Sequence, residues 1–97
     1  MDIDVTQPMS PQRARTLIRK ILKSGKVIFT SHAREELDKD DLTERDATNV
    51  LRGGIVDEPE WENGAYRYRV RTQLMEVIVE FESIDGVLVI TAWKRRR

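Results

Sequence analysis

The sequence predicts an α+β domain, with N-terminal helices packed on one face of a three- to five-stranded, mainly antiparallel sheet. In the first half of the chain, apolar residues recur every three or four positions, which is typical of amphipathic helices. In the second half they alternate with polar residues, which is typical of half-buried strands. Two turn signals, Asn63-Gly64 and Asp85-Gly86, separate the alternating segments and indicate hairpins. Helices and an antiparallel sheet that are segregated along the chain define this class.

The first helix has clear start and stop signals. Ser10 is expected to be its N-cap and Pro11 its first residue, because both types are favoured at these positions. Gly25 is expected to end the helix. The next residues, 26–30, are predicted to form a short strand or an extended entry to the second helix.

Two shorter helices are predicted to follow. Ser31 is expected to cap the second helix, which extends to about Lys39. Thr43 and Asp46, three positions apart, predict a capping box at the start of the third helix. The pair Gly53-Gly54 is expected to end that helix.

The remaining segments are predicted strands. Ile55 and Val56 begin an edge strand that either ends before Pro59 or continues to Trp61. The last strand is apolar on both faces, so we place it centrally in the sheet. The three longer strands are expected over residues 65–72, 75–82 and 87–93.

Composition restricts the chemistry. The chain of 97 residues has no cysteine and one histidine, so we expect neither a metal site nor a cofactor. No stretch approaches the roughly 20 apolar residues of a membrane span, and nothing resembles a signal peptide. We therefore expect a cytoplasmic protein without a membrane segment, with a flexible leader over residues 1–9 and a single domain over residues 10–97.

Acidic and basic residues balance at 17 each, but they are segregated along the chain. Six basic residues and no acid occur from Arg13 to Lys26, whereas seven acids occur from Glu35 to Asp46. Such segregation can orient a protein on RNA or on a charged partner, and the acidic segment is a candidate dock for a basic partner. The alternative is an ordinary solvated surface.

Several short segments, taken in order, resemble a bacterial family of small domains of unknown function whose signature opens with Ser-x-His-Ala. The resemblance covers roughly residues 26 to 94, and the family is similar to the RelE/ParE-type toxins of toxin–antitoxin pairs. The matching segments are the short strand followed by Ser31, His32 and Ala33, Leu42 to Asp46, Val50 to Ile55, the strand with Arg67 and Val70, and Val89 to Ala92.

The resemblance implies a RelE/ParE-like fold, a cognate antitoxin as partner, and either metal-independent RNA cleavage or ribosome binding. A gyrase poison with the same fold is a further alternative. Members of the family usually carry arginines where this chain has Glu36 and Asp40. That reversal of charge favours a different class of function, a non-catalytic partner-binding module.

His32 is the candidate catalytic residue, with Glu35 as an accessory. RNA cleavage without a metal needs a base for the ribose 2′-hydroxyl proton, and His has an unperturbed pKa of about 6.5. At the start of a helix, backbone N–H groups favour a phosphate, so a base role suits this imidazole better than an acid role. The alternative is that His32 bonds a neighbouring carbonyl and fixes the turn.

Three arginines at the two-residue period of a strand, Arg67, Arg69 and Arg71, are candidate phosphate ligands. The alternative is cross-strand pairing with glutamates of the next strand. Trp93, Lys94 and Arg95 complete the candidate RNA-binding set, and Thr91 is expected at the same end of the sheet. Tyr66 and Tyr68 are expected in the core, and an exposed edge strand would permit a homodimer. The candidate glutamate partners are Glu76, Glu80 and Glu82.

Overall fold

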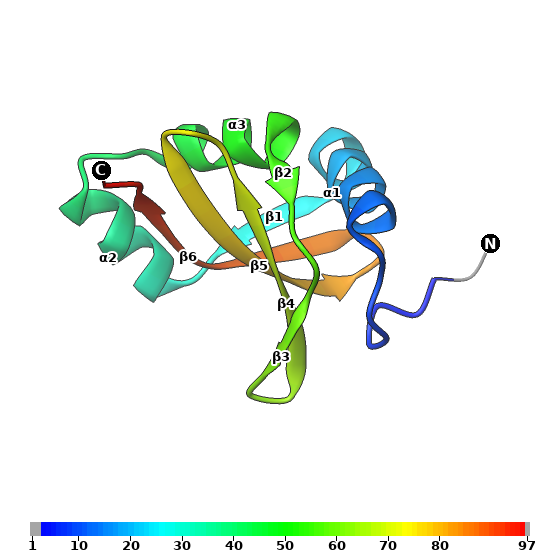
Figure 1. Cartoon of the computed structure of the whole chain (residues 1–97). Helices are drawn as coiled ribbons and strands as arrows, with labels where there is room; N and C mark the ends of the chain where they lie inside the picture. The colour runs from blue at the N-terminus through cyan, green and yellow to red at the C-terminus, as the bar shows by residue number, and fades with distance from the viewer. Residues whose placement is uncertain (1–2, 97) are drawn as a thin grey trace.

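A six-stranded mixed sheet forms the centre of the protein, in the order β1-β6-β5-β4-β2 with β3 pairing with β4. The computed structural model describes residues 3–96 (Figure 1). The predicted α+β class is confirmed. The helices are α1 (Pro11–Ser24), α2 (Ser31–Lys39) and α3 (Glu44–Gly53), and the strands are β1 (Lys26–Phe29), β2 (Ile55–Val56), β3 (Glu60–Glu62), β4 (Ala65–Arg71), β5 (Met75–Ser83) and β6 (Gly86–Lys94).

The sheet has more strands than the predicted three to five for two reasons. The edge segment stops at Val56 and resumes at Glu60, because Pro59 has no N–H to donate to a ladder. The segment after the first helix also joins the sheet, as β1, and pairs in parallel with β6. All other strand pairs are antiparallel.

The predicted caps of the first and third helices are confirmed. The Ser10 side chain accepts a hydrogen bond from the Arg13 N–H, and Thr43 and Asp46 form the predicted capping box. The prediction that Ser31 caps the second helix is wrong. Thr30 has the extended backbone of an N-cap and its hydroxyl accepts the Ala33 N–H at 3.0 Å, whereas Ser31 is already helical.

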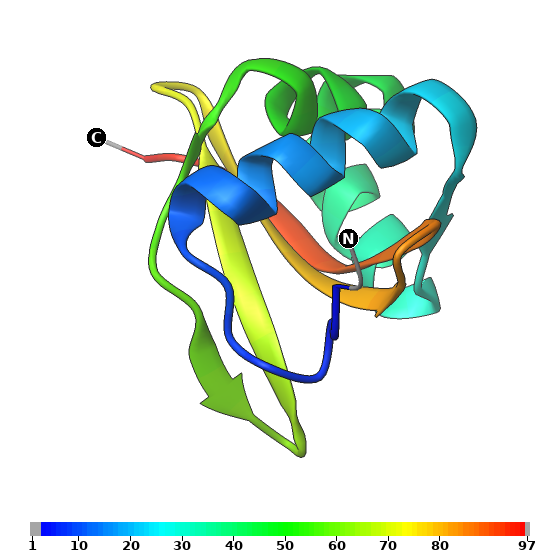
Figure 2. The ribbon, with the colours of Figure 1, turned by 90° about the vertical axis from the view of Figure 1, so that its right-hand side faces the viewer.

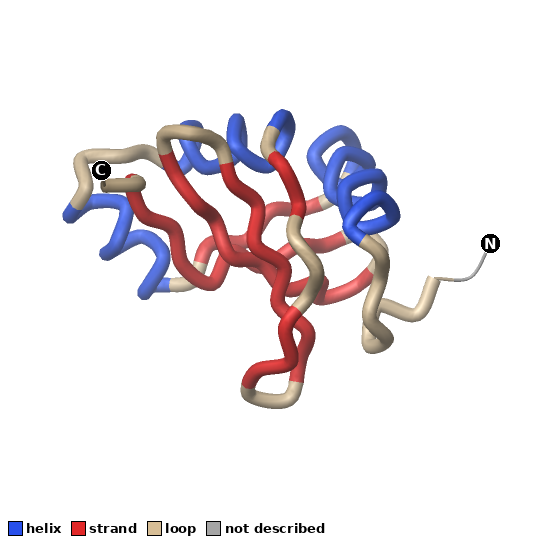
Figure 3. Tube along the Cα trace, in the orientation of Figure 1, coloured by secondary structure: helices blue, strands red, loops and turns tan. Residues whose placement is uncertain are grey.

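The core lies between one face of the sheet and the helices. Figure 2 shows α1 and α3 side by side over that face, and α2 packs against β6 beyond the end of β1. The β3–β4 hairpin, which turns at Asn63-Gly64, extends away from the main body (Figure 3). Within residues 3–96, no helix covers the opposite face of the central strands, which we call the open face (Figure 2).

Tyr68 is a fully buried core residue, as expected from its place beside Val70. Its ring packs edge-on against Phe81, and its hydroxyl accepts a hydrogen bond from the Met9 N–H at 2.9 Å. Burial raises the pKa of the Tyr68 phenol above its usual value. Within the predicted leader, Met9 is buried and both Ile3 and Val5 pack against the core; residues 1 and 2 lie outside the described residues.

Gly54 should be far more sensitive to substitution than its neighbour Gly53. A Cβ at Gly54 would lie 2.7 Å from the Val50 carbonyl oxygen and 2.8 Å from that of Arg71, whereas a Cβ at Gly53 would meet nothing within 4 Å. We expect Gly54→Ala to lower the free energy of unfolding by about 2 to 3 kcal/mol. Gly53→Ala should leave it unchanged or raise it by up to about 1 kcal/mol. Urea denaturation measures both, and equal effects would contradict this packing.

Candidate functional site

A bulge in β6 decides which of its side chains face the open side. Val79 of β5 pairs with Val89 of β6, whereas the adjacent β5 residue, Ile78, pairs with Thr91. Ile90 is therefore an extra residue in β6. Before the bulge the odd-numbered residues of β6 are buried, and after it Ala92 is buried instead. Bulges re-aim side chains in this way. As a result, Thr91 and Trp93 leave the core face and line the open face.

Thr30 holds this bulge in place. Its N–H donates to the Val89 carbonyl at 3.1 Å, and its hydroxyl donates to the Ile90 carbonyl at 3.0 Å. The same hydroxyl oxygen accepts the Ala33 N–H at the start of α2. One side chain therefore fixes both the entry of α2 and the bulge. The sequence analysis had placed the N-cap of this helix at Ser31. The residue whose hydroxyl caps it is the preceding one, Thr30.

Two grooves lie on the open face and share Thr91 and Trp93. The first, here called the arginine groove, has a volume of about 590 Å³. It carries four carboxylates and two guanidiniums and is therefore negatively charged, whereas a phosphate site needs a positive charge. Its lining residues are Asp57, Glu58, Glu60, Glu62, Arg67, Arg69, Ile78, Thr91 and Trp93.

The second groove, here called the tail groove, lies between α2 and the end of β6 and has a volume of about 590 Å³. Three cations and two carboxylates line it together with Thr91 and Trp93. Asp40, whose side chain is 11% exposed, ties the chain end to α2, because it accepts the Lys94 N–H at 2.8 Å and an Arg96 N–H at 2.9 Å. The charged lining residues are Glu36, Lys39, Asp40, Lys94 and Arg96.

The arginines of β4 are engaged by carboxylates. Arg67, whose side chain is 21% exposed, donates to Glu80 at 2.8 Å and lies 3.4 Å from Glu62. Arg71 donates to Asp57 at 3.0 Å, and this carboxylate raises the pKa of the guanidinium above its usual range. The cross-strand alternative of the sequence analysis is thus present at Arg67.

Arg69 belongs to a cluster around Trp93. Its guanidinium carbon lies 5.9 Å from the centroid of the Trp93 ring, within the range of a cation–π contact. Arg69 Nη1 lies 3.1 Å from Glu76 Oε1, although that oxygen has no aligned hydrogen-bond donor, and Arg95 Nε lies 3.5 Å from Glu76 Oε2. We attribute the contact of Arg69 with Glu76 to charge rather than to a directed hydrogen bond. Glu76 therefore holds two guanidiniums, on either side of one carboxylate.

His32 and Glu35 do not join these residues. The His32 side chain is 61% exposed on α2, and its Nε2 lies 3.9 Å from Glu36 Oε1. Neither His32 nor Glu35 lines the arginine groove or the tail groove. Of the residues predicted from sequence, the structure brings together Arg67, Arg69, Thr91 and Trp93 in one groove, and Lys94 joins Thr91 and Trp93 in the other.

The sequence analysis missed Glu36, Asp40 and Arg96 as residues of the site. Glu36 and Asp40 are four positions apart, so they share one face of α2. That spacing, together with the basic end of the chain, was a usable signal that an acidic helix face meets a basic tail. The two positions had been considered as places where this chain departs from its relatives and as part of the acidic segment from Glu35 to Asp46, but not together with the chain end.

Within residues 3–96, no group of three or more His, Cys, Asp or Glu side chains could hold a metal ion. No helix in this part of the chain is long and apolar enough to cross a membrane.

The fold is similar to that of a chain of the toxin–antitoxin complex RelBE2 from Mycobacterium tuberculosis. The TM-score is 0.52 and the identity 21%, over 74% of this chain and 99% of that chain. This likeness supports the expected RelE-like fold and, at this identity, shows the fold alone. No protein-family model and no curated protein matches the chain, so the expected membership in the family of unknown function is not confirmed.

Replacement of Thr30 by Val should disturb both elements that its hydroxyl joins. Thr30→Val keeps the shape but removes the N-cap and leaves the Ile90 carbonyl without this donor. We expect a loss of about 2 kcal/mol in the free energy of unfolding, measured by chemical denaturation. Thr30→Ser retains the hydroxyl and should stay within about 0.5 kcal/mol of the parent. If the two variants unfold alike, the hydroxyl does not hold the bulge.

Proposed function

We propose that this chain is the toxin component of a toxin–antitoxin pair and acts by binding RNA, free or in the ribosome, across Trp93. The observation that carries the proposal is the position of Trp93, a half-buried ring that forms the common wall of two grooves on the open face. The likeness to a chain of a toxin–antitoxin complex supports the choice of class.

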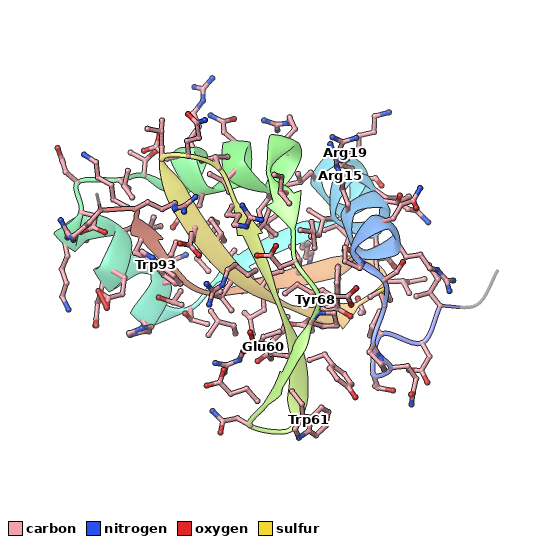
Figure 4. The ribbon with its side chains drawn as sticks, in the orientation of Figure 1. Arg15, Arg19, Glu60, Trp61, Tyr68 and Trp93 are labelled. Atoms are coloured by element: carbon pink, nitrogen blue, oxygen red, sulfur yellow. The ribbon has the colours of Figure 1, made fainter. Side chains whose placement is uncertain are left out.

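The indole of Trp93 is suited to stack on an RNA base. Single-stranded nucleic acids bind by stacking bases on aromatic side chains next to cations that contact the phosphates. Arg69 over the Trp93 ring and Thr91 beside it supply a cation and a hydroxyl within reach of the same base. Figure 4 shows Trp93 near α2, well separated from Trp61 on the β3–β4 hairpin.

The phosphate contacts are assigned to the tail groove rather than to the arginine row. Arg67 and Arg71 would have to exchange an intramolecular carboxylate for a phosphate, which yields little net free energy. Lys94 contributes only its backbone N–H to Asp40, and within residues 3–96 no carboxylate lies at ion-pair distance from its ammonium group. Lys39 and Arg96 flank the same groove but are paired with Glu36 and Asp40, so Lys94 is the cation to which the proposal assigns the phosphate. A strand of RNA would therefore place a base on Trp93 and its backbone toward Lys94.

The proposal does not extend to cleavage by His32. A general base must come within hydrogen-bond reach of the hydroxyl proton that it removes. His32 lines neither groove, and its Nε2 lies 3.9 Å from Glu36 Oε1, at the border of the tail groove, so the proposal assigns this imidazole no role in the chemistry.

The second candidate function is a non-catalytic partner-binding module. The acidic lining of the arginine groove favours it, because carboxylates of β3 and of the loop before it, Glu58, Glu60 and Glu62, suit a basic protein segment and repel RNA. In this case induced expression should not arrest growth. The same carboxylates oppose a homodimer formed through the edge strand β3, since two copies would bring like charges together.

The two tryptophans provide a matched test of the RNA proposal. Stacking contributes about 1 to 3 kcal/mol per base, so Trp93→Ala should weaken binding of a single-stranded RNA by about tenfold or more. Trp61→Ala removes an equally large but 62% exposed ring outside both grooves and should change the affinity by less than about twofold. Fluorescence anisotropy at constant salt measures both, with thermal unfolding as the check on folding.

The two variants should also differ from each other in cells, in the same direction as in the binding assay. Induction of the parent chain and of Trp61→Ala should arrest growth, whereas Trp93→Ala should relieve the arrest. No arrest by the parent, together with RNA affinity that both variants leave unchanged, would overturn the proposal in favour of the partner-binding module.

A further inference from the structure

Several cations with no carboxylate partner among residues 3–96 lie together on the helical side of the protein, away from the open face. Figure 4 shows Arg15 and Arg19 on α1. A groove of about 540 Å³, here called the helix groove, continues from there between α1 and α3. Its lining residues are Arg19, Lys20, Leu22, Lys23 and Arg52.

These cations have no ion-pair partner within residues 3–96, in contrast to the arginines of β4. Arg19 donates to the Arg52 carbonyl at 3.2 Å, and Arg52 donates to the Asn49 side chain at 2.9 Å. Both contacts orient the guanidiniums without neutralising them. Four positive charges thus border one groove and have no carboxylate at ion-pair distance.

The helix groove also has an apolar component. Leu22 is half-buried and is one of its lining residues. At the other end of α1, a second groove of about 330 Å³ is lined by Pro11, Gln12, Arg15, Ile55 and Val56. Ile55, 58% exposed, is one of the largest apolar surfaces of the described chain. Cations and aliphatic side chains therefore line both grooves, one near each end of α1.

We infer that this α1 surface binds an acidic amphipathic segment of a protein partner. Carboxylates of such a segment would pair with Arg19, Lys20 and Lys23, and its apolar side chains would cover Leu22 and Ile55. RNA fits this surface less well, because the residues that line the two α1 grooves include no aromatic ring on which a base could stack. The assignment of the partner as the antitoxin rests on the proposed function, whereas the binding chemistry does not.

The open face and the α1 surface lie on opposite sides of the sheet, and each is complementary to a different ligand. The open face takes RNA at Trp93, and the α1 surface takes an acidic protein segment. A segment bound along α1 leaves Trp93 and the tail groove accessible, so the two ligands need not compete for the same residues.

The test uses a synthetic peptide in which Leu recurs at three- and four-residue spacings with Glu between. Binding to the full chain is measured by fluorescence anisotropy. The variant Lys20→Glu with Lys23→Glu should weaken binding by about tenfold or more, since two attractions become repulsions. The matched control, Lys26→Glu with Arg45→Glu, changes the same charge outside the helix groove and should weaken binding by less than about twofold. Ile55→Thr should weaken it by about fivefold through lost apolar contact.

Three results would overturn the inference: no binding of the peptide, an equal loss in both charge-reversal variants, or a tenfold loss of oligouridine affinity in the first variant with peptide binding unchanged. The last result would make the α1 surface an RNA site. Because the peptide assay contains no RNA, its outcome is independent of the growth arrest and Trp93 measurements that test the proposed function.

Discussion

The register shift between β5 and β6 is the constraint on which the candidate site depends. A regular β6 would send Thr91 and Trp93 into the core together with Val87 and Val89, and the open face would then lack its aromatic side chain. The extra residue at Ile90 reverses the alternation and buries the small Ala92 instead. Thr30 stabilises this arrangement, because its hydroxyl serves the bulge and the helix cap at the same time. Thr30 therefore links the start of α2, which borders the tail groove, to the bulge that turns Trp93 toward that groove.

The distribution of charge explains why a chain of zero formal net charge can have distinct binding surfaces. On the open face most cations are neutralised locally, as at Arg67 with Glu80 and at Arg96 with Asp40. Four cations of α1, Arg15, Arg19, Lys20 and Lys23, have no carboxylate of residues 3–96 at ion-pair distance. The local balance of paired and unpaired charge, rather than the number of basic residues, therefore distinguishes a structural arginine from one that is available to a ligand.

Much of the fold could be predicted from the sequence, because local signals determine it. The caps at Ser10 and Thr43 and the Asn63-Gly64 turn act within a few residues of themselves, and the structure confirms each of them. The bulge at Ile90 could not be predicted, since it depends on contacts with Thr30, 60 positions earlier in the chain. The pairing of Arg71 with Asp57 was missed for the same reason, because only the fold brings that loop beside β4. His32 had been selected on its chemistry, its place at a helix start and the Ser-x-His-Ala signature, all of which are local, whereas its place relative to the grooves is a tertiary property.

The central claim is that RNA engages the open face at Trp93 while α1 serves another ligand. The chain has two tryptophans, so its ¹H–¹⁵N spectrum contains two indole N–H signals, and a titration with single-stranded RNA at constant ionic strength reads both at once. The account predicts that the Trp93 indole and the Thr91 and Lys94 amides shift, while the Trp61 indole and the α1 amides stay in place. Shifts confined to α1, with the Trp93 signal unmoved, would contradict it.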